Sequence, residues 1–414
     1  MASKFQAPRG TFDVLPEAAR ERARLERAAA GIFARAGYET IATPAFEDTA
    51  LFERGVGKST DIVRKEMFTF EDKGGRNLTL RPEGTASICR AYLEHGMHKL
   101  AQPVKLSYLG PFFRHERPQA GRYRQFHQLG AECIGTDSPL ADAEVIMLLS
   151  DLLDELGVPG VELRLGSLGS LDARRAYLED LKAHLHAHEG DLSKDVRERI
   201  DINPLRAFDA DDEGTRGVMA SAPTIVAQLE GEDAEHFAEV RSQLDAVGVS
   251  YVVDPTLVRG LDYYTRTIFS FVCDQLGAQS EIGGGGRYDG LIEQLGGPAT
   301  PAVGFAAGIE RILLALDEEI PAAGRDAFVA VADPAQRQRA MALVVELRRA
   351  GLSAETDLAG RGLKGQLKHA NRIGARRVLI LDADGSAQLR DMETGEQRAV
   401  DPGKLVEEMT GRQS

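Results

Sequence analysis

Several arginines stand at positions where a positive charge calls for an anion, and the first is Arg259. The run from Leu257 to Phe269 reads LVRGLDYYTRTIF, and its β-branched and aromatic residues are typical of a β-strand. Strand side chains alternate between two faces, so Arg259 would share a face with Leu261 and Tyr263 and have no acid beside it. A buried, unpaired charge is strongly disfavoured. We therefore expect Arg259 to meet an anion in a cleft, or to be solvated on an edge strand.

A second group of arginines lies in the segment KLSYLGPFFRHERPQAGRYRQFHQLGAE, residues 105–132. The segment predicts a strand, a loop with a turn at residues 118–121, and a second strand. Planar guanidinium groups bind oxyanions in a bidentate manner, so the cluster suits phosphate. The alternative is a solvated loop whose arginines pair with acids of the same chain. The four arginines are Arg114, Arg117, Arg122 and Arg124.

The second of these strands also carries polar side chains on one face. Gln128, Gly130 and Glu132 alternate, and a buried Gln and Glu are costly unless they are paired. A cationic, hydrogen-bonding ligand would satisfy both side chains, and a solvated face would do so equally well. The nearby sequence Arg81-Pro-Glu-Gly-Thr85 adds Glu83 and Thr85, which alone could simply be helix-capping residues in a turn.

A third arginine ends the small-residue run Gly304-Phe-Ala-Ala-Gly-Ile-Glu-Arg311, which leads into an apolar helix. Small residues allow a flat ligand to approach the backbone closely, and Arg311 could then reach a phosphate. The competing interpretation is a glycine-spaced strand that only packs tightly against the helix.

Two further clusters are weaker candidates. His184, His186 and His188 lie on a predicted helix, but only the first and last share a face and no third ligand is apparent, so we expect no metal site there. In the tail, residues 361–377 contain no acid, and Lys364, Lys368 and Arg372 form one stripe at helical spacing. Such a stripe either binds a phosphate backbone or is a solvated face.

The elements that would position these side chains follow from the apolar periodicity. The pattern predicts a helix over residues 17–36, a strand over 38–43, a hairpin over 67–80 and a helix over 141–156. Residues 170–247 are helix-rich and acidic and indicate an inserted helical module. After a linker near residues 321–325, strands and helices alternate, which predicts a small α/β domain with partly parallel strands.

Size and composition set the limits of the interpretation. A chain of 414 residues is expected to form two to three domains. We find no run of about 18 apolar residues and no apolar signal core at the N-terminus, so neither membrane nor secretion is expected. Three scattered cysteines fit a reducing compartment. The net charge of −14 argues against general nucleic-acid binding. Residues 325–414, however, hold 15 basic and 13 acidic side chains, so this part of the chain could still bind nucleic acid locally.

Taken in order, these segments resemble the class II aminoacyl-tRNA synthetases. FRHE at residues 113–116 and the strand that ends in Glu310-Arg311 resemble motifs 2 and 3, although Ala306 stands where motif 3 often has a glycine. Residues 38–44 resemble motif 1, the dimer-forming element. Residues 257–264 (LVRGLDYY) and 284–290 (GGGRYDG) resemble the two signature segments of histidyl-tRNA synthetases, and residues 9–16 (RGTFDVLP) and 81–85 (RPEGT) fit the same family.

The resemblance covers essentially the whole chain and implies an α+β fold. Residues 1–325 would form a class II catalytic domain around a central antiparallel sheet, with a helical insertion at residues 170–247. Residues 327–414 would form an α/β anticodon-binding domain. The family implies a cytoplasmic homodimer.

The implied activity is that of a histidine–tRNA ligase, with histidine, ATP carrying Mg²⁺, and tRNA(His) as substrates. Arg114 and Arg259 would act on the α-phosphate of ATP, and Arg311 would bind the γ-phosphate. The turn from Arg117 through Gln119 to Arg122 would face the tRNA acceptor end, and Lys364, Lys368 and Arg372 would face the tRNA elsewhere. The residues implied at the histidine site are Glu83, Thr85, Gln128, Glu132, Tyr263, Tyr264 and Tyr288.

One structural expectation follows from the resemblance. Arg259 and Tyr264 would lie on opposite faces of an ideal strand, so a shared site requires the backbone to kink, which Gly260 allows most easily.

The alternative function is a histidine-binding regulatory subunit of ATP phosphoribosyltransferase. That family shares the catalytic-domain fold but typically lacks both the tail domain and the RGLDYY pattern.

Overall fold

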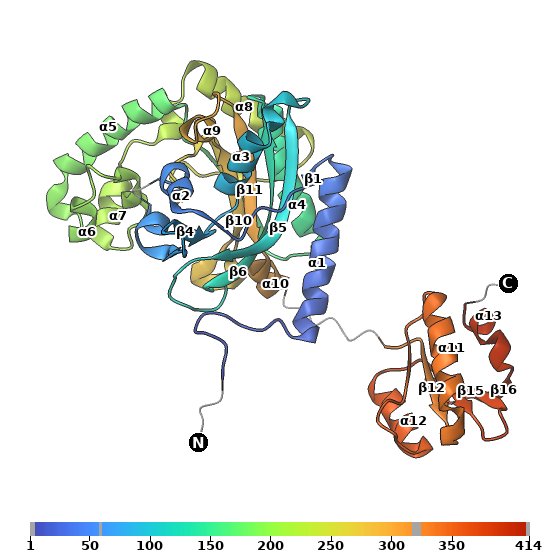
Figure 1. Cartoon of the computed structure of the whole chain (residues 1–414). Helices are drawn as coiled ribbons and strands as arrows, with labels where there is room; N and C mark the ends of the chain where they lie inside the picture. The colour runs from blue at the N-terminus through green and yellow to red at the C-terminus, as the bar shows by residue number, and fades with distance from the viewer. Residues whose placement is uncertain (1–4, 58–59, 317–323, 411–414) are drawn as a thin grey trace. The chain divides into compact units, whose positions relative to one another are not determined.

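The computed structural model describes residues 5–57, 60–316 and 324–410 (Figure 1). The chain divides into two compact units, Met1–Glu319 and Ile320–Ser414. Each unit has its own buried apolar clusters.

An eight-stranded sheet forms the centre of the larger unit (Figure 1), in the order β1-β5-β6-β11-β10-β9-β7-β8. The strands from β5 to β7 in this order pair antiparallel, while the edge pairs β1–β5 and β7–β8 are parallel. The predicted central antiparallel sheet is therefore confirmed. The strands are β1 (Glu39–Thr40), β5 (Val104–Phe113), β6 (Gln125–Ile134), β7 (Val161–Ser167), β8 (Val252–Val253), β9 (Thr265–Cys273), β10 (Glu281–Arg287) and β11 (Ala302–Gly308).

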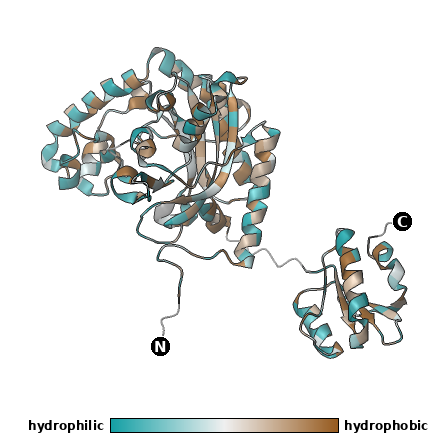
Figure 2. Cartoon of the chain, viewed as in Figure 1, coloured by the Kyte–Doolittle hydropathy of each residue, from teal (hydrophilic) through white to brown (hydrophobic). Residues whose placement is uncertain are grey.

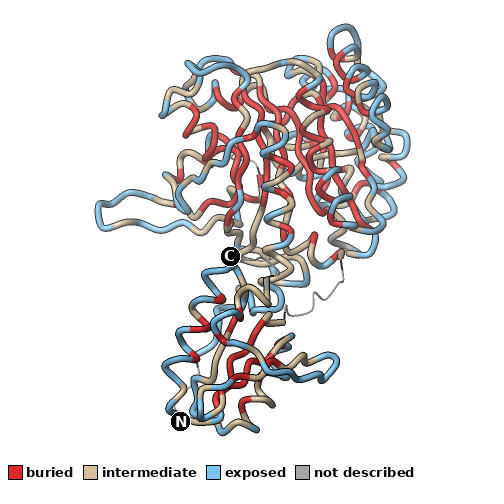
Figure 3. Tube along the Cα trace, turned by 90° about the vertical axis from the view of Figure 1, so that its right-hand side faces the viewer, coloured by how far each residue is buried: buried red, intermediate tan, exposed pale blue. Residues whose placement is uncertain are grey.

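Four helices cover one face of this sheet: α1 (Pro16–Arg35), α4 (Pro139–Leu156), α8 (Gly231–Ala246) and α10 (Ile309–Leu316). Helix α1 begins with Pro16 in its first turn and buries a stripe that contains Leu25, Ala29 and Ile32. Helix α4 packs against α1, α8 and β11. The apolar colouring of the sheet and of the adjoining helix faces marks this core in Figure 2, and Figure 3 shows the same segments as buried.

The opposite face of the sheet carries less regular structure, with α3 (Thr85–Glu94) and α9 (Leu291–Gln294) packed on a second apolar cluster. A small antiparallel sheet lies beside it in the order β2-β4-β3, formed by β2 (Phe46–Asp48), β3 (Phe68–Glu71) and β4 (Asn77–Leu80). Helix α2 (Thr49–Gly55) and a π-helical turn at Ile62–Glu66 complete this side. The predicted hairpin corresponds to β3 and β4.

Residues 170–247, the expected insertion, are largely helical. Helices α5 (Leu171–Ala187), α6 (Lys194–Arg197) and α7 (Glu213–Met219) share an apolar cluster, and Figure 1 shows them grouped at one side of the larger unit. Helix α8, near the end of the same segment, packs on α4 in the core of the central sheet. The rings of His184 on α5 and of His188, the residue after α5, are tilted by 40° with their centroids 4.7 Å apart. Among the described residues, we find no group of three or more His, Cys, Asp or Glu side chains placed to hold a metal ion.

The smaller unit is a five-stranded sheet in the order β13-β12-β14-β15-β16 with helices on both faces. Strands β13, β12 and β14 are parallel and the last two pairs are antiparallel, which confirms the predicted partly parallel α/β arrangement. Its elements are β12 (Ala327–Val331), α11 (Arg337–Arg349), β13 (Ala354–Thr356), α12 (Leu363–Arg372), β14 (Arg377–Leu381), β15 (Ala387–Asp391), β16 (Gln397–Val400) and α13 (Leu405–Thr410).

One strand prediction is wrong. Strand β9 begins at Thr265, so residues 257–264 form a loop with a bend at Gly260 instead of the first half of a strand. The irregularity of β9 itself lies at Arg266, which has a φ of 46° and sits opposite a shift in the β9–β10 register. Arg266 forms an ion pair with Asp233 of α8 at 3.2 Å. No helix in the described ranges is both long enough and apolar enough to cross a membrane.

Candidate active site

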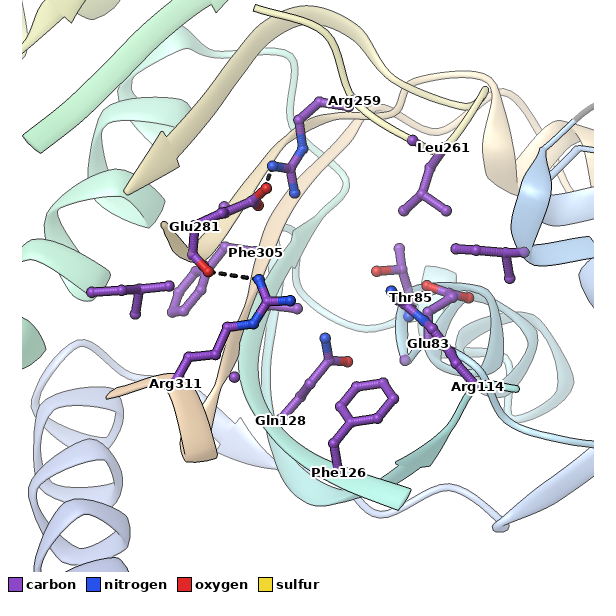
Figure 4. A pocket seen from close by; sticks show the side chains of 18 of the residues that line it. Glu83, Thr85, Arg114, Phe126, Gln128, Arg259, Leu261, Glu281, Phe305 and Arg311 are labelled. Carbon is purple, nitrogen blue, oxygen red and sulfur yellow. Dashed lines mark hydrogen bonds and ion pairs between the residues drawn. The ribbon is translucent and has the colours of Figure 1, made fainter. Parts of the chain in front are cut away.

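A cavity of about 630 Å³ opens on the less regular side of the central sheet (Figure 4). Strands β6, β10 and β11 form its floor, and the loop 257–264, the start of α3 and the loop after β5 form its walls. Segments that are far apart in the sequence therefore contribute to one site. The residues expected at the histidine site that line it are Glu83, Thr85, Gln128, Tyr263, Tyr264 and Tyr288. The arginines expected at the site that line it are Arg114, Arg122, Arg259 and Arg311.

Glu83 and Thr85 lie where α3 begins. The Glu83 carboxylate accepts hydrogen bonds from the backbone N–H groups of Thr85 (2.8 Å) and Ala86 (2.9 Å), so it caps the helix and meets the positive end of the helix dipole. Burial raises the pKa of Glu83, although these two hydrogen bonds oppose the rise. The capping interpretation is thus correct, and the same carboxylate also faces the cavity.

Glu132 is fully buried and lies behind the wall of the cavity instead of lining it. Its carboxylate accepts hydrogen bonds from the Thr85 hydroxyl (2.8 Å) and the Tyr288 hydroxyl (2.6 Å). Burial raises the pKa of Glu132 to about 8, against the lowering effect of these two donors. A side chain at Gly304 would overlap this carboxylate, so glycine is required opposite it. Glu132 fixes two residues that do face the ligand space.

Three tyrosines form the apolar part of the wall. The rings of Tyr263 and Tyr264 are 4.7 Å apart, and Tyr263 meets Tyr288 edge-to-face at 5.7 Å. The Tyr263 hydroxyl donates to Glu83 at 3.4 Å. Because residues 257–264 form a bent loop, Arg259 and Tyr264 both reach the cavity, which strict strand alternation would have prevented.

The arginines are held by the protein on their inner sides. Arg114 donates from Nε to the Pro82 carbonyl (2.9 Å), and its guanidinium lies 5.4 Å from the centre of the Phe126 ring. Arg311 donates to the carbonyls of Gly121 (3.0 Å) and Glu281 (2.7 Å).

Arg259 forms an ion pair with the Glu281 carboxylate (Figure 4). Its guanidinium also lies over the ring of Tyr264. Arg259 thus lines a cavity and meets an anion there, but the anion is a carboxylate of its own chain that local sequence did not indicate. Glu281 is 22 residues further along the chain and is the first residue of β10.

The residues expected at tRNA lie in two separate places. Gln119 and Arg122 form a turn in the loop after β5. Arg122 lines the cavity and forms an ion pair with Glu116. Arg117 and Gln119 are exposed and do not line the cavity. In the smaller unit, Lys364, Lys368 and Arg372 lie on α12 and are exposed, as the predicted stripe requires.

Sequence reasoning missed several residues of the site. Tyr108 on β5 lines the cavity, and among the described residues its hydroxyl has no hydrogen-bond partner. Strand alternation could have placed it, because Tyr108 shares a face with the buried Leu106 and Phe112. Glu281 and Arg206 also line the cavity, and Arg206 reaches it from the inserted segment, where it pairs with Asp61 at 3.4 Å. No local pattern in the sequence marks either residue.

Comparisons with known proteins agree with this arrangement. A family model described as Histidyl-tRNA synthetase matches residues 10–312, and one described as Anticodon binding domain matches residues 326–412. The chain is 48% identical over 412 residues to the histidine–tRNA ligase of Rubrobacter xylanophilus, covering 96% of this chain and 97% of that protein. It is 47% identical to the histidine–tRNA ligase of Halothermothrix orenii, covering 98% of each. The crystal structure of apo S. aureus histidyl-tRNA synthetase superimposes with a TM-score of 0.83 at 35% identity, covering 98% of this chain and all of that one.

Proposed function

The chain belongs to the histidyl-tRNA synthetase family, and we propose that its cavity carries out both steps of a histidine–tRNA ligase reaction. In the first step, the histidine carboxylate attacks the α-phosphorus of ATP, and histidyl-adenylate and pyrophosphate result. In the second step, the histidyl group passes to the 3′ end of tRNA(His). The observation that carries the assignment of the site is that carboxylate, amide and tyrosine groups line the same cavity as Arg114, Arg259 and Arg311.

The carboxylate, amide and tyrosine side chains of the cavity would form the histidine site. Histidine carries an α-ammonium group and an imidazole N–H, which are donors that Glu83 and Gln128 can accept from inside the cavity. Among the described residues, the Gln128 Oε1 atom is buried without a hydrogen-bond partner, so it is free to receive one of them. Thr85 and Tyr288, held by Glu132, and the rings of Tyr263 and Tyr264 would shape the space for the imidazole.

The three arginines would form the ATP site. Arg114 and Arg259 lie on different sides of the cavity and would contact the α-phosphate from both, which stabilises the charge that develops on its oxygens in the transition state (Figure 4). Arg311 would hold the γ-phosphate. The guanidiniums of Arg114 and Arg311 are anchored by hydrogen bonds to main-chain carbonyls, so these two arginines need little reorganisation when the nucleotide binds.

Magnesium would enter with ATP. In nucleotide sites Mg²⁺ is held by phosphate oxygens, water and one or two carboxylates instead of an all-protein cage. Single carboxylates such as Glu116 and Glu310 line this cavity, which fits that chemistry. The bound ion would neutralise charge on the β- and γ-phosphates.

The remaining assignments concern the tRNA and the assembly. We propose that residues 1–325 catalyse, that residues 170–247 are an insertion in that domain, and that residues 327–414 bind the anticodon region, with Lys364, Lys368 and Arg372 facing phosphates. The turn from Arg117 to Arg122 borders the cavity and would meet the acceptor end. We also propose a cytoplasmic homodimer, on the resemblance of residues 38–44 to motif 1.

The regulatory-subunit alternative is not favoured. Proteins of that kind typically lack an anticodon-binding tail, whereas residues 326–412 match such a domain. They also lose the RGLDYY pattern, whereas here Arg259, Tyr263 and Tyr264 from that pattern line the cavity.

Histidine-dependent exchange of labelled pyrophosphate into ATP tests the first step directly. The purified protein with Mg²⁺ is expected to catalyse it with histidine and not with other amino acids. An absence of exchange would refute the proposed chemistry. Co-purification with a phosphoribosyltransferase would then favour the regulatory role.

Arg259→Ala tests the role of the arginine. Loss of one transition-state donor typically costs ~100-fold or more in rate, so single-turnover formation of the adenylate should slow by at least that factor. Histidine affinity should change less than the rate, because Arg259 lies beside Glu281 and away from Glu83 and Thr85 (Figure 4). An unchanged single-turnover rate would refute the assignment.

A further inference from the structure

Glu281, the first residue of β10, connects two of the arginines assigned to ATP. Its carboxylate forms the ion pair with Arg259 Nη1, and its main-chain carbonyl accepts a hydrogen bond from Arg311 Nη1 at 2.7 Å (Figure 4). It is therefore an anion of the protein itself, placed among groups that would bind the anions of ATP.

The two members of the ion pair differ in their freedom to move. The Arg259 side chain is only 14% exposed, and its guanidinium lies between the Tyr264 ring, 5.8 Å from the ring centre, and the backbone of Gly284. A Cβ atom at Gly284 would lie 2.8 Å from Arg259 Nη1, so the glycine leaves just enough room for the guanidinium. The Glu281 side chain is 42% exposed and has space beside it in the cavity. When a competing anion arrives, the carboxylate is the partner that can leave.

The charge of Glu281 is also secured. Burial alone would raise its pKa, but the positive charges of Arg259, Arg311 and Arg114 hold the pKa of this carboxyl below its ordinary value. Glu281 is thus ionised at neutral pH. In the empty cavity it offsets one positive charge of the three arginines that would contact the triphosphate.

We propose that Glu281 is a positioning residue that acts through Arg259: it holds the guanidinium in the empty site as an internal counter-ion, and the α-phosphate of ATP displaces it. This inference rests on the proposed role of Arg259. The carboxylate keeps Arg259 in place before ATP arrives, but it must be separated from the guanidinium and then lies near a phosphate of like charge. Both costs weaken the binding of ATP.

Glu281→Gln tests the proposal, because it keeps the size and the acceptor oxygen but removes the charge. Without histidine no adenylate forms, so the Kd of ATP can be measured by equilibrium dialysis. The variant should bind ATP about fivefold more tightly, the size expected for one partly exposed ion pair. Glu281→Asp keeps the charge and should remain within about twofold of the unmodified protein. Adenosine, which has no phosphate, should bind equally to all three.

The split between KM and rate provides the second readout. In single-turnover adenylate formation, Glu281→Gln should lower the KM for ATP while the rate at saturating ATP stays within about threefold, because Arg259 remains packed by Tyr264. In an Arg259→Gln background, the gain in ATP affinity should largely disappear.

Three results would overturn the inference. ATP could bind no more tightly, or less tightly, to Glu281→Gln, as a direct role in holding Mg²⁺ would require. The same gain could appear for adenosine, or it could persist in full without Arg259. These results are distinct from a failure of the proposed function, which would appear as an absence of histidine-dependent exchange in the unmodified protein. Because Glu281 is half-exposed at the edge of the cavity, the substitutions do not disturb a buried core.

Discussion

Glu132 shows how one buried carboxyl links binding to stability. It is 0% exposed, and its oxygens accept hydrogen bonds from two residues of the cavity wall. A pKa of about 8 means that the folded protein holds this carboxyl largely protonated at pH 7, whereas an unfolded chain would ionise it at its ordinary pKa near 4.5. At a pH between about 4.5 and about 8, Glu132 therefore binds a proton when the chain folds.

The consequence is a stability difference that depends on pH. As the pH rises from about 4.5 to about 8, the unmodified protein loses stability because the unfolded state ionises first, and the loss is complete above about 8. Glu132→Gln does not titrate, so its melting temperature relative to the unmodified protein should rise between pH 5.5 and pH 8.5 by at least about 3 °C. Thermal unfolding at both pH values measures this shift. Glu293→Gln, at an exposed position on α9, is the matched control, and an equal response of both variants would contradict the explanation.

Helix α5, at the start of residues 170–247, contacts a wall of the cavity through a partly buried arginine. Arg174 of α5 donates from Nη1 to the carbonyls of Asp262 (3.2 Å) and Tyr264 (3.0 Å), the last residues of the loop before β9. This loop has no ladder of strand hydrogen bonds, so its shape depends on such contacts. The insertion thereby supports the wall that would enclose the imidazole.

Arg174→Met should therefore weaken histidine binding without removing any group from the cavity. Hydrogen bonds from a charged donor contribute about 1.5–3 kcal/mol, so we expect the KM for histidine to rise by about tenfold as the Tyr264 backbone loosens. The neighbouring Arg175 is exposed and pairs only with Asp172 at 3.5 Å among the described contacts, so Arg175→Met is the matched control. Amino-acid-dependent exchange at varied histidine measures both. Equal KM values for the two variants would refute a supporting role of Arg174.

The same loop explains where prediction from sequence succeeded and where it failed. Long periodic elements such as α1 and α4, the hairpin of β3 and β4, and the alternation of the smaller unit follow from local patterns and were predicted. The run LVRGLDYYTRTIF has strand-like composition throughout, but contacts from α5 and from Glu281 hold its first half in a loop. Tertiary contacts outweigh strand propensity there. Glu281 could not be predicted as the partner of Arg259 because the pairing depends on how the loop 257–264 folds back over β10, which no local pattern in the sequence specifies.

The whole molecule consists of two units with separate apolar cores, and we assign a different role to each. The larger unit contains the cavity, and the smaller one carries the basic face of α12. On the proposed function, activation of histidine would use only groups of the cavity, whereas tRNA recognition would draw on both units. The two activities should therefore respond differently to substitutions in the smaller unit.

Lys368→Glu in the full-length chain provides a test of this division. Reversing one charge that faces a phosphate backbone should raise the KM for tRNA by about fivefold and reduce its salt dependence, while histidine-dependent exchange stays unchanged. Lys404→Glu, at an exposed position of the same unit, carries the same charge change away from α12 and serves as the control. Aminoacylation at two salt concentrations measures the effect. An equal loss in both variants would mean that only the overall charge of the unit matters.

The glycine run of β10 limits how the cavity could change in evolution. At Gly283 and Gly284, which line the cavity, an added Cβ atom would lie 2.6 Å from Ala307 Cβ and 2.5 Å from the Phe269 carbonyl, and at Gly285 it would overlap the Gly304 carbonyl. This wall therefore consists of main chain, and a point mutation cannot reshape it without displacing neighbouring strands. New amino-acid specificity would have to arise at lining positions that carry side chains, such as Gln128 on β6 and Tyr264 in the loop 257–264, so the adaptive variation open to this site excludes the glycine run.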